Sequence, residues 1–267
     1  MKKILSIVLL CAILSLSCFF TSCKAPALEK EENGAFRNPK TGIVYYPASP
    51  NYYAKPTGKD PYARIEVGKG AEDFLLYQIG ELDPERYLVS NAYTVYCAEG
   101  AELPALYDFP CSRVGIYDTQ VASNDGNITE AADISALKEL HKNGVFTTLS
   151  NVSIYMDMTT EWYDLHFMGE GTQAEIYYQL KYGVFVEDVL IVELVEDEET
   201  FVDLYPGIPY ELMWETYGGE QYYVAKYNFG KEILCDVATG NCYKIEVENS
   251  LLPYITPSED ANLGDAQ

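Results

Sequence analysis

The chain lacks most of the residues and motifs on which enzyme families depend. It has only two histidines, His141 and His166, and no GxSxG or HExxH sequence, the motifs that place nucleophiles, bases or zinc ligands in several hydrolase families. It also has no glycine-rich phosphate loop and no dinucleotide-binding fingerprint. The sequence therefore identifies no catalytic residue and no cofactor, and we expect a binding or structural role rather than an enzymatic one.

Basic residues are scarce as well. The chain has 18 Lys and Arg against 41 Asp and Glu, for a formal net charge of −23. A polyanion repels phosphate backbones, so we expect no nucleic-acid partner. The acids are spread along the chain, and the segment most like a calcium loop, residues 123–130, fails the test of spacing. When Gly126 is aligned with the fixed glycine of an EF-hand, two essential ligand positions fall on Val121 and Ala132. We therefore predict a turn there and no metal site.

Long apolar runs are missing except at the N-terminus. Residues 4–16 are almost wholly apolar and directly follow Met1, Lys2 and Lys3. The run is shorter than the roughly 20 residues that a membrane-spanning helix needs. A positive start, a short apolar core and small residues at its end are typical of a secretory signal peptide.

The end of that segment, Phe20-Thr21-Ser22-Cys23, resembles the lipobox of bacterial lipoproteins, with Phe20 where leucine is commonest. The resemblance covers these N-terminal residues alone. It implies cleavage before Cys23, a diacylglycerol and palmitate anchor on that cysteine, and a cell-membrane protein that faces outside the cytoplasm. Cys11 and Cys18 fit less well, because Leu10 is too large to precede a cleavage site and Ser15 stands where a large apolar residue is expected.

Four regions follow from this interpretation. Residues 1–22 are the signal peptide, 23–40 the lipidated cysteine and a flexible tether, 41–256 a β-rich extracytoplasmic domain, and 257–267 a disordered acidic tail. A boundary within this domain is expected near residues 145–150, directly after a predicted helix that ends near residue 144.

The pattern within the domain predicts an α+β fold that is predominantly antiparallel β with one clear helix. Asp133 is the expected N-cap of a helix over residues 133–143, which Gly144 ends, and Thr129 is an alternative start that would place Glu130 and Asp133 near the positive end of the helix dipole. Alternating or apolar runs predict strands at residues 43–46, 64–67, 73–79, 87–89, 93–97, 114–117, 153–158, 162–168, 175–186, 189–195, 222–227, 232–237 and 242–247.

Four cysteines fall within this domain. Cys235 and Cys242 flank a Gly-Asn turn between two predicted strands, and Cys97 and Cys111 flank a short loop that contains Pro104. Export makes disulfides chemically reasonable, so each neighbouring pair is a candidate bridge, although four cysteines allow three connectivities. No closely spaced CxxC pair favours a zinc site.

Tyrosine is abundant, with 24 residues, and it is doubled at residues 45–46, 52–53, 177–178 and 222–223. Doubled tyrosines in a strand point to opposite faces, which suits a sheet with one buried and one wet face. Alternation likewise separates Glu161 and Tyr163 from Trp162 and Asp164, so these acids do not converge locally. Two functions remain open: a lipid-anchored binding or structural module with a protein or glycan ligand, or a surface-anchored hydrolase acting on glycans or peptides.

Overall fold

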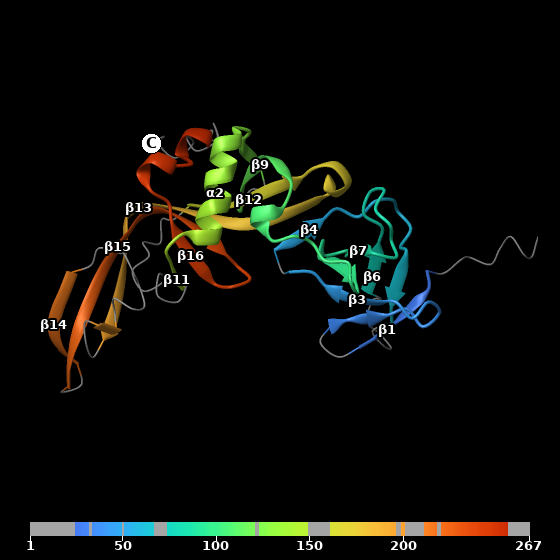
Figure 1. The fold of residues 1–267 in the computed structure, drawn as a ribbon, viewed down its shortest axis with the longest axis horizontal. Coiled ribbons are helices and arrows are strands. Elements are labelled where there is room, and N and C mark those ends of the chain that lie inside the picture. Colours follow the sequence, from blue (N-terminus) through green and yellow to red (C-terminus); the bar gives the residue numbers. More distant parts are fainter. Residues whose placement is uncertain are drawn as a thin grey trace, which may run out of the picture.

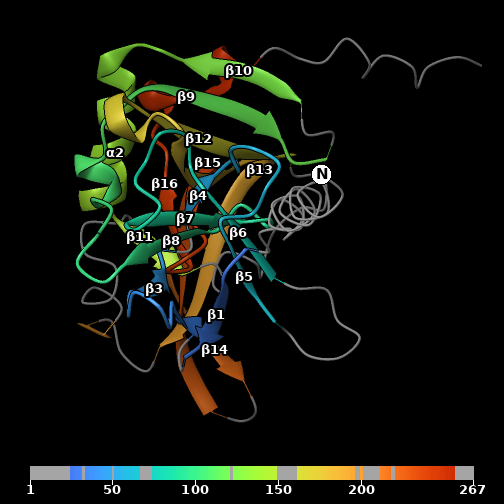
Figure 2. The same ribbon diagram turned by 90° about the vertical axis from the view of Figure 1, so that its right-hand side faces the viewer.

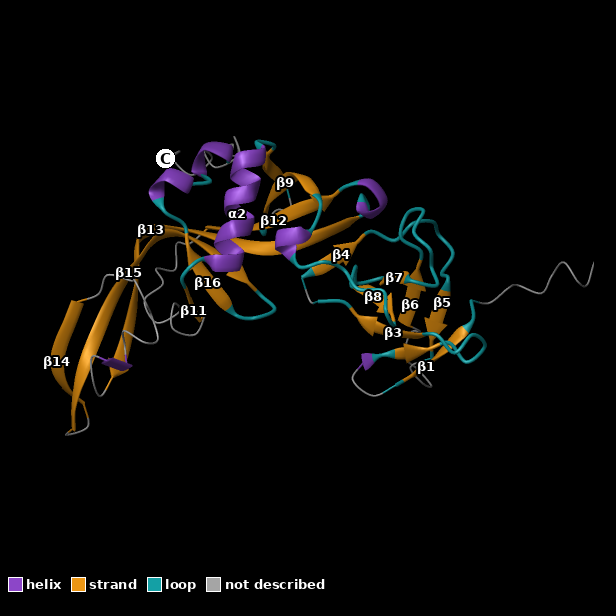
Figure 3. Ribbon diagram, viewed as in Figure 1, coloured by secondary structure: helices purple, strands orange, loops and turns teal. Residues whose placement is uncertain are grey.

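The described residues of the computed structural model are 25–31, 34–49, 51–66, 74–120, 123–148, 161–195, 199–200, 211–217 and 220–255. This part of the chain is mostly β, which confirms the prediction of a β-rich, predominantly antiparallel fold. Its strands form a closed barrel and a second, larger sheet, which lie side by side (Figures 1 and 3). No helix within the described residues has the length and apolar character needed to cross a membrane.

The barrel is built from short strands in the order β1-β2-β3-β8-β7-β6-β5. Its strands are β1 (Ala27–Lys30), β2 (Phe36–Arg37), β3 (Val44–Pro47), β5 (Ala63–Ile65), β6 (Phe74–Tyr77), β7 (Tyr87–Ser90) and β8 (Val95–Ala98). Figure 2 shows them from the barrel side. Neighbours pair antiparallel, apart from the parallel pair β1–β5 that closes the barrel.

Residues 23–40 were expected to form a flexible tether, and the structure corrects this for the described part. Strands β1 and β2 lie within this segment and belong to the barrel. Leu28, Ala35 and Phe36 are buried in its core. No periodic pattern marks these strands, because they are very short and the parallel partner of β1, strand β5, lies more than thirty residues away.

The second sheet runs in the order β10-β9-β12-β13-β15-β16-β11. Its strands are β9 (Cys111–Asp118), β10 (Asn124–Ile128), β11 (Phe146–Thr148), β12 (Glu161–Gly169), β13 (Ile176–Val195), β15 (Glu220–Asp236) and β16 (Asn241–Lys244). Strand β14 (Glu211–Tyr217) pairs with β15, and β4 (Tyr52–Ala54) pairs with β13. The change from barrel to second sheet therefore falls between β8 and β9, and β11, at residues 146–148, lies within the second sheet.

Strands β13 and β15 are each longer than predicted. Each was predicted as two separate strands, because residues 187–188 and Gly230 interrupt the apolar runs. In the structure the strands continue, and the interruption is a shift of pairing register between Val184 and Val189. Gly230 allows this bulge with a left-handed φ of 81°.

One helix, α2 (Ala131–Asn143), packs against β9 and the short 3-10 turn η2 (Leu106–Asp108). It buries Ile134 and Leu137 and ends at Gly144, as predicted. Its start differs by two residues: Glu130 occupies the N-cap position, and the carboxylate of Asp133 accepts a hydrogen bond from the Tyr254 hydroxyl instead of capping the helix.

A continuous hydrophobic core joins the two sheets. Tyr45, Leu76 and Leu88 of the barrel belong to the same buried cluster as Leu165, Phe167 and Leu180 of the second sheet. Tyr52, on β4, lies at the junction, where its ring meets Phe109 at 5.5 Å and Tyr178 at 4.9 Å between centroids. The barrel and the sheet therefore share one core.

The C-terminal turns η5 (Val247–Asn249) and η6 (Leu252–Tyr254) are held to the second sheet by a buried carboxylate. Glu232 accepts hydrogen bonds from the hydroxyls of Tyr182 and Ser250, both at 2.6 Å, and from the backbone N–H of Leu251 at 2.9 Å. A buried charge is tolerated here because three donors replace water.

The remaining differences concern strands without a sequence signal or residues outside the described part. Strands β4, β10 and β11 were not predicted, because they are short or polar, and β14 was not predicted either. The segment at residues 123–130, expected to be a turn, contains β10. The signal peptide with Cys23, the predicted strand at 153–158 and the tail from 257 lie outside the described residues.

Candidate functional site

The structure brings one of the two predicted cysteine pairs together. Cys235 and Cys242 are direct register partners across the β15–β16 hairpin, at disulfide distance and with Cα atoms 4.2 Å apart. Cys97 and Cys111 are both free cysteines instead. Cys97 is buried in β8 of the barrel, and Cys111 begins β9, where its Sγ contacts the carbonyl oxygen of Arg113 at 3.1 Å. The two flank the transition between the sheets and belong to different ones.

No group of three His, Cys, Asp or Glu side chains that could hold a metal ion occurs among the described residues. The acidic and aromatic stretch at residues 161–164 alternates as predicted. Tyr163 turns inward and donates a hydrogen bond to Glu161 at 2.8 Å, whereas Asp164 pairs with Lys181 at 2.6 Å on the other face. The carboxylates of Glu161 and Asp164 therefore lie on opposite faces of the strand and do not converge.

The second sheet therefore has two distinct faces. The inner face, on which α2 packs, carries Tyr163, Leu165 and Phe167 of β12, all buried. The outer face carries the alternate residues of the same strand, Trp162, Asp164 and His166, which are half-buried. Two clusters with functional side chains lie on these two faces.

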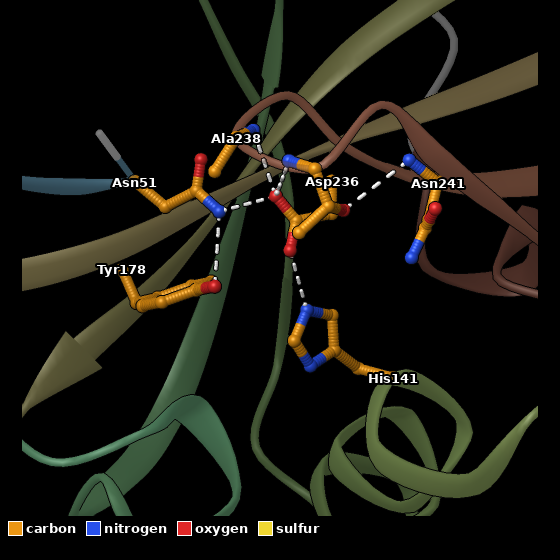
Figure 4. A network of polar contacts seen from close by, with 7 residues as sticks. Asn51, His141, Tyr178, Asp236, Ala238 and Asn241 are labelled. Carbon is orange, nitrogen blue, oxygen red and sulfur yellow. Dashed lines mark hydrogen bonds and ion pairs between the residues drawn. The ribbon is translucent and has the colours of Figure 1, made fainter. Parts of the chain in front are cut away.

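The first is the Asp236 cluster, which comprises Asp236, His141, Asn51 and Tyr178 on the inner face (Figure 4). The ring of His141, from the last turn of α2, places Nε2 2.9 Å from Asp236 Oδ2. The side-chain amide of Asn51 donates to Asp236 Oδ1 at 2.6 Å and to the Tyr178 hydroxyl at 2.9 Å. The backbone N–H of Ala238 adds a further bond to Oδ1 at 2.8 Å. Four segments far apart in the sequence thus meet on one carboxylate.

This carboxylate is stabilised in its charged form. Burial by itself would raise the pKa of Asp236, but the hydrogen bonds from His141, Asn51 and the Ala238 N–H outweigh it and lower the pKa to about 2. Burial also raises the pKa of Tyr178 to about 12, and the nearby Asp236 charge adds to this shift. The cluster is therefore built around a carboxylate anion whose charge is stabilised by hydrogen-bond donors. These bonds fix α2, β13 and the hairpin relative to one another.

The role of His141 was missed in the sequence. Its position on the apolar side of a helix pointed to packing and to the helix dipole, and its partner lies 95 residues away on another element. No local pattern links a helix histidine to an aspartate at the start of a hairpin turn. A histidine bonded to a buried aspartate resembles two members of a catalytic triad, but a triad also needs a nucleophile in contact with the ring.

The second cluster is the tyrosine row, which comprises Tyr53, Tyr177, His166 and Tyr117 on the outer face. Tyr53 and Tyr177 are register partners on β4 and β13, and their rings stack at 5.7 Å. His166 of β12 stacks on Tyr177 at 4.3 Å, and the ring of Tyr117 on β9 lies 4.4 Å from it at a tilt of 33°. The rings thus form a line across four adjacent strands.

Two glycines make room for aromatic rings on this face. His166 pairs with Gly115 on β9, and a Cβ at Gly115 would lie 2.7 Å from the ring of Tyr117. The Tyr117 ring therefore lies over the glycine and reaches His166, an aromatic covering of a strand glycine. Trp162 lies over Gly183 in the same way, with ring atoms 3.0 Å from the position of an added Cβ.

The row is uncharged at neutral pH. Burial lowers the pKa of His166 to about 4, with smaller opposing effects from Asp164 and Gln179 and further lowering by Lys55 and Lys181. Burial raises the pKa of Tyr177 to about 12, and Tyr53, Asp164, Tyr93 and Tyr117 add to that shift.

A third feature is a cavity of about 230 Å³ between α2 and the C-terminal turns. Leu137, Ile245 and Leu251 line its apolar floor, and the carboxylates of Asp133 and Glu248 lie on its walls. It is smaller than the roughly 300–1,000 Å³ of typical small-molecule sites.

Comparison with known proteins identifies no relative: no family model, no curated protein and no solved structure matches the chain. The functional argument therefore depends on the geometry of these clusters.

Proposed function

We propose that the protein is a lipid-anchored module that binds a ligand outside the cytoplasm through the tyrosine row. The observation that carries this proposal is the continuous line of half-buried rings on the outer face. On the inner face the tyrosines are buried and bonded within the fold, so packing fully accounts for them. On the outer face the rings are half-buried, so part of each ring is accessible to a partner.

The anchor is proposed from the N-terminal sequence, where residues 20–23 resemble a lipobox. Replacement of the lipid-accepting residue by Cys23→Ser should abolish fatty-acid labelling and move the protein out of the membrane fraction. Cys18→Ser is the matched control and should leave both properties unchanged. Continued labelling of the Cys23→Ser variant, or a lipid located on Cys18, contradicts the assignment.

The binding surface is tested by hydroxyl-radical footprinting of the full-length protein. We compare isolated membranes of the producing cells with protein purified in detergent. Tyr53, Tyr117 and Tyr177 should be protected in the membranes, whereas Tyr46 and Tyr107, which are exposed elsewhere on the surface, should label equally in both preparations. Equal labelling of the row in both preparations would contradict the proposal.

A hydrolase is the second candidate, and one observation favours it: Asp133 and Glu248 share the cavity beside α2. Glycoside hydrolysis uses two carboxylates on opposite sides of the scissile bond. If this cavity is an active site, the protein should release reducing sugars from polysaccharides, and Glu248→Gln should abolish the release. Glu246→Gln, on the neighbouring turn, is the control.

A further inference from the structure

The tyrosine row presents ring edges rather than ring faces to its surroundings. His166 lies on the central strand of the row, with Tyr117 on one side at 4.4 Å and Tyr177 on the other at 4.3 Å. Both faces of the imidazole are therefore covered within the row, and Tyr53 covers Tyr177 from the far side. What remains available along the row is a series of ring edges that carry phenol hydroxyls.

These edges offer hydrogen bonds without net charge. Burial raises the pKa of Tyr53 and of Tyr177, so their phenols stay protonated at pH 7 and each can both donate and accept a hydrogen bond. Among the flanking charges, Asp164 and Lys181 are opposite each other in the register and form an ion pair at 2.6 Å. The row is thus a line of uncharged polar rings on a chain with a net charge of −23.

A strained residue lies beside the row. Tyr93 is the only described residue other than glycine with a positive φ, at 66°, and its side chain is 49 % exposed. A left-handed bulky residue costs about 1–3 kcal/mol, and such strain concentrates at ligand-binding sites. Its backbone is fixed by the bond from Ala54 N–H to the Tyr93 carbonyl at 3.0 Å, which ties it to the strand that carries Tyr53. The fold therefore holds an additional tyrosine next to the row.

We propose that the tyrosine row and Tyr93 form a recognition site for a neutral glycan, which lies along the row and hydrogen-bonds to the ring edges. This inference rests on the proposed function and adds the class of ligand. Four strands at a spacing of about 4.8 Å make the row about 14 Å long, which suits a short oligosaccharide rather than a single sugar. Sugar hydroxyls, like the ring edges, donate and accept together, so one ligand can satisfy the whole line.

A protein partner fits this surface less well. Protein interfaces gain most of their affinity from aromatic anchors whose apolar faces enter a pocket of the partner. In the row, those apolar faces are already buried against one another. An anionic polymer is also disfavoured, because the chain as a whole, with a net charge of −23, repels it.

The test uses substitutions that remove hydroxyls but keep the stacked rings. Full-length protein in non-ionic detergent is applied to immobilised neutral polysaccharides (β-glucan, xylan, galactomannan and amylose) and to anionic ones (polygalacturonate and heparin). We compare the wild type with the Tyr117→Phe/Tyr177→Phe double variant. Tyr46→Phe, at a 45 % exposed tyrosine of the barrel, is the matched control, and circular dichroism verifies that each variant is folded.

The wild type and Tyr46→Phe should bind at least one neutral polysaccharide, and the double variant should bind it at least tenfold more weakly. Binding to none of the neutral polymers, binding to the anionic polymers alone, or full binding by the double variant would each overturn the glycan assignment. The footprint in membranes separates this failure from failure of the proposed function. If the row is protected there but binds no neutral polysaccharide, it is a binding surface for another ligand, and loss of the footprint after protease treatment would identify that ligand as a protein.

Discussion

The inner and outer faces of the second sheet use the same residue types for opposite purposes. Tyr177 and Tyr178 are consecutive on β13, yet Tyr177 stacks in the row while Tyr178 bonds to Asn51 beneath α2. Each face also has one histidine. His141 bonds to an aspartate and sits among donors and acceptors, whereas His166 is enclosed by two rings. The role of these tyrosines and histidines therefore depends on the face of the sheet on which they lie, and not on the residue type.

The difference lies in how completely each cluster is satisfied from within. On the inner face, both oxygens of Asp236 have protein donors, and the residue is 3 % exposed. On the outer face the rings satisfy one another by stacking, but their polar edges are left for solvent or a ligand. We therefore expect the inner cluster to control stability and the outer row to control binding, and the following experiments test that division.

The largest effect should come from removing the inner carboxylate. Asp236→Ala leaves Asn51, His141 and the Ala238 N–H without their acceptor, so we expect a loss of about 3–5 kcal/mol in the free energy of unfolding. Urea denaturation followed by circular dichroism measures it. His166→Ala on the outer face is the comparison and should cost less than half as much. Equal costs would remove the distinction between the faces. Asp236→Asn, which keeps the volume, should fall between the two if the alanine variant does not fold.

The pH dependence of stability should separate the two faces into two windows. The pKa of His166 is lowered to about 4, so between pH 6.5 and 4 the unfolded chain takes up a proton that the folded chain refuses, and stability falls as the pH falls. Asp236, with a pKa of about 2, loses its stabilising contribution only below about pH 3.8. We expect the first window to cost about 2–3 kcal/mol.

Urea denaturation at several pH values measures this dependence, and His166→Gln should remove the fall between pH 6.5 and 4 while leaving the fall below pH 3.8. His141→Gln is the matched variant on the inner face. An unchanged profile in His166→Gln would show that the imidazole titrates freely and is not enclosed by the row.

The two faces also meet at the C-terminal hairpin, because Cys235 and Asp236 are consecutive residues. Asp236 holds the hairpin to α2 from the inner face, and Cys235 faces Cys242 across the strands. We expect a disulfide between them, and the Cys235→Ser/Cys242→Ser double variant should lose about 2 kcal/mol, since the loop that it closes is short. The Cys97→Ser/Cys111→Ser variant is the control for thiol removal.

Non-reducing peptide mapping of protein purified without reductant decides whether the bridge exists. A single linked peptide containing residues 235 and 242, with unlinked Cys97 and Cys111, is the expected result. Free thiols at both positions, or a linked Cys97–Cys235 peptide, would contradict it.

Features that depend on residues close together in the sequence could be predicted, whereas features that depend on a partner distant in the sequence could not. Alternation and doubled tyrosines predicted most strands of the second sheet. They also predicted that the two faces of β13 differ, with one face buried and the other accessible to solvent. The helix was predicted to within two residues of its start because its apolar spacing and Gly144 are local signals. Strand β1 was missed, because its pairing with β5 depends on a distant partner. The His141–Asp236 bond was missed for the same reason, and of the tyrosine row only the doubled tyrosines carried a signal.

The smallest predicted effect is also the sharpest comparison, because it uses adjacent tyrosines and the same substitution. Tyr178→Phe removes the acceptor of one Asn51 N–H in a buried setting, so we expect a loss of about 1–2 kcal/mol in the free energy of unfolding. Tyr177→Phe removes a hydroxyl at the half-buried outer edge and keeps the ring that stacks on His166, so its cost should stay below about 0.5 kcal/mol. Urea denaturation of the two variants in parallel measures the difference. If Tyr177→Phe costs as much as Tyr178→Phe, the outer hydroxyls are engaged within the fold and are not free to bind a ligand. If the difference is as expected, Tyr177→Phe, the substitution with the smaller effect on stability, is the one that we expect to weaken glycan binding.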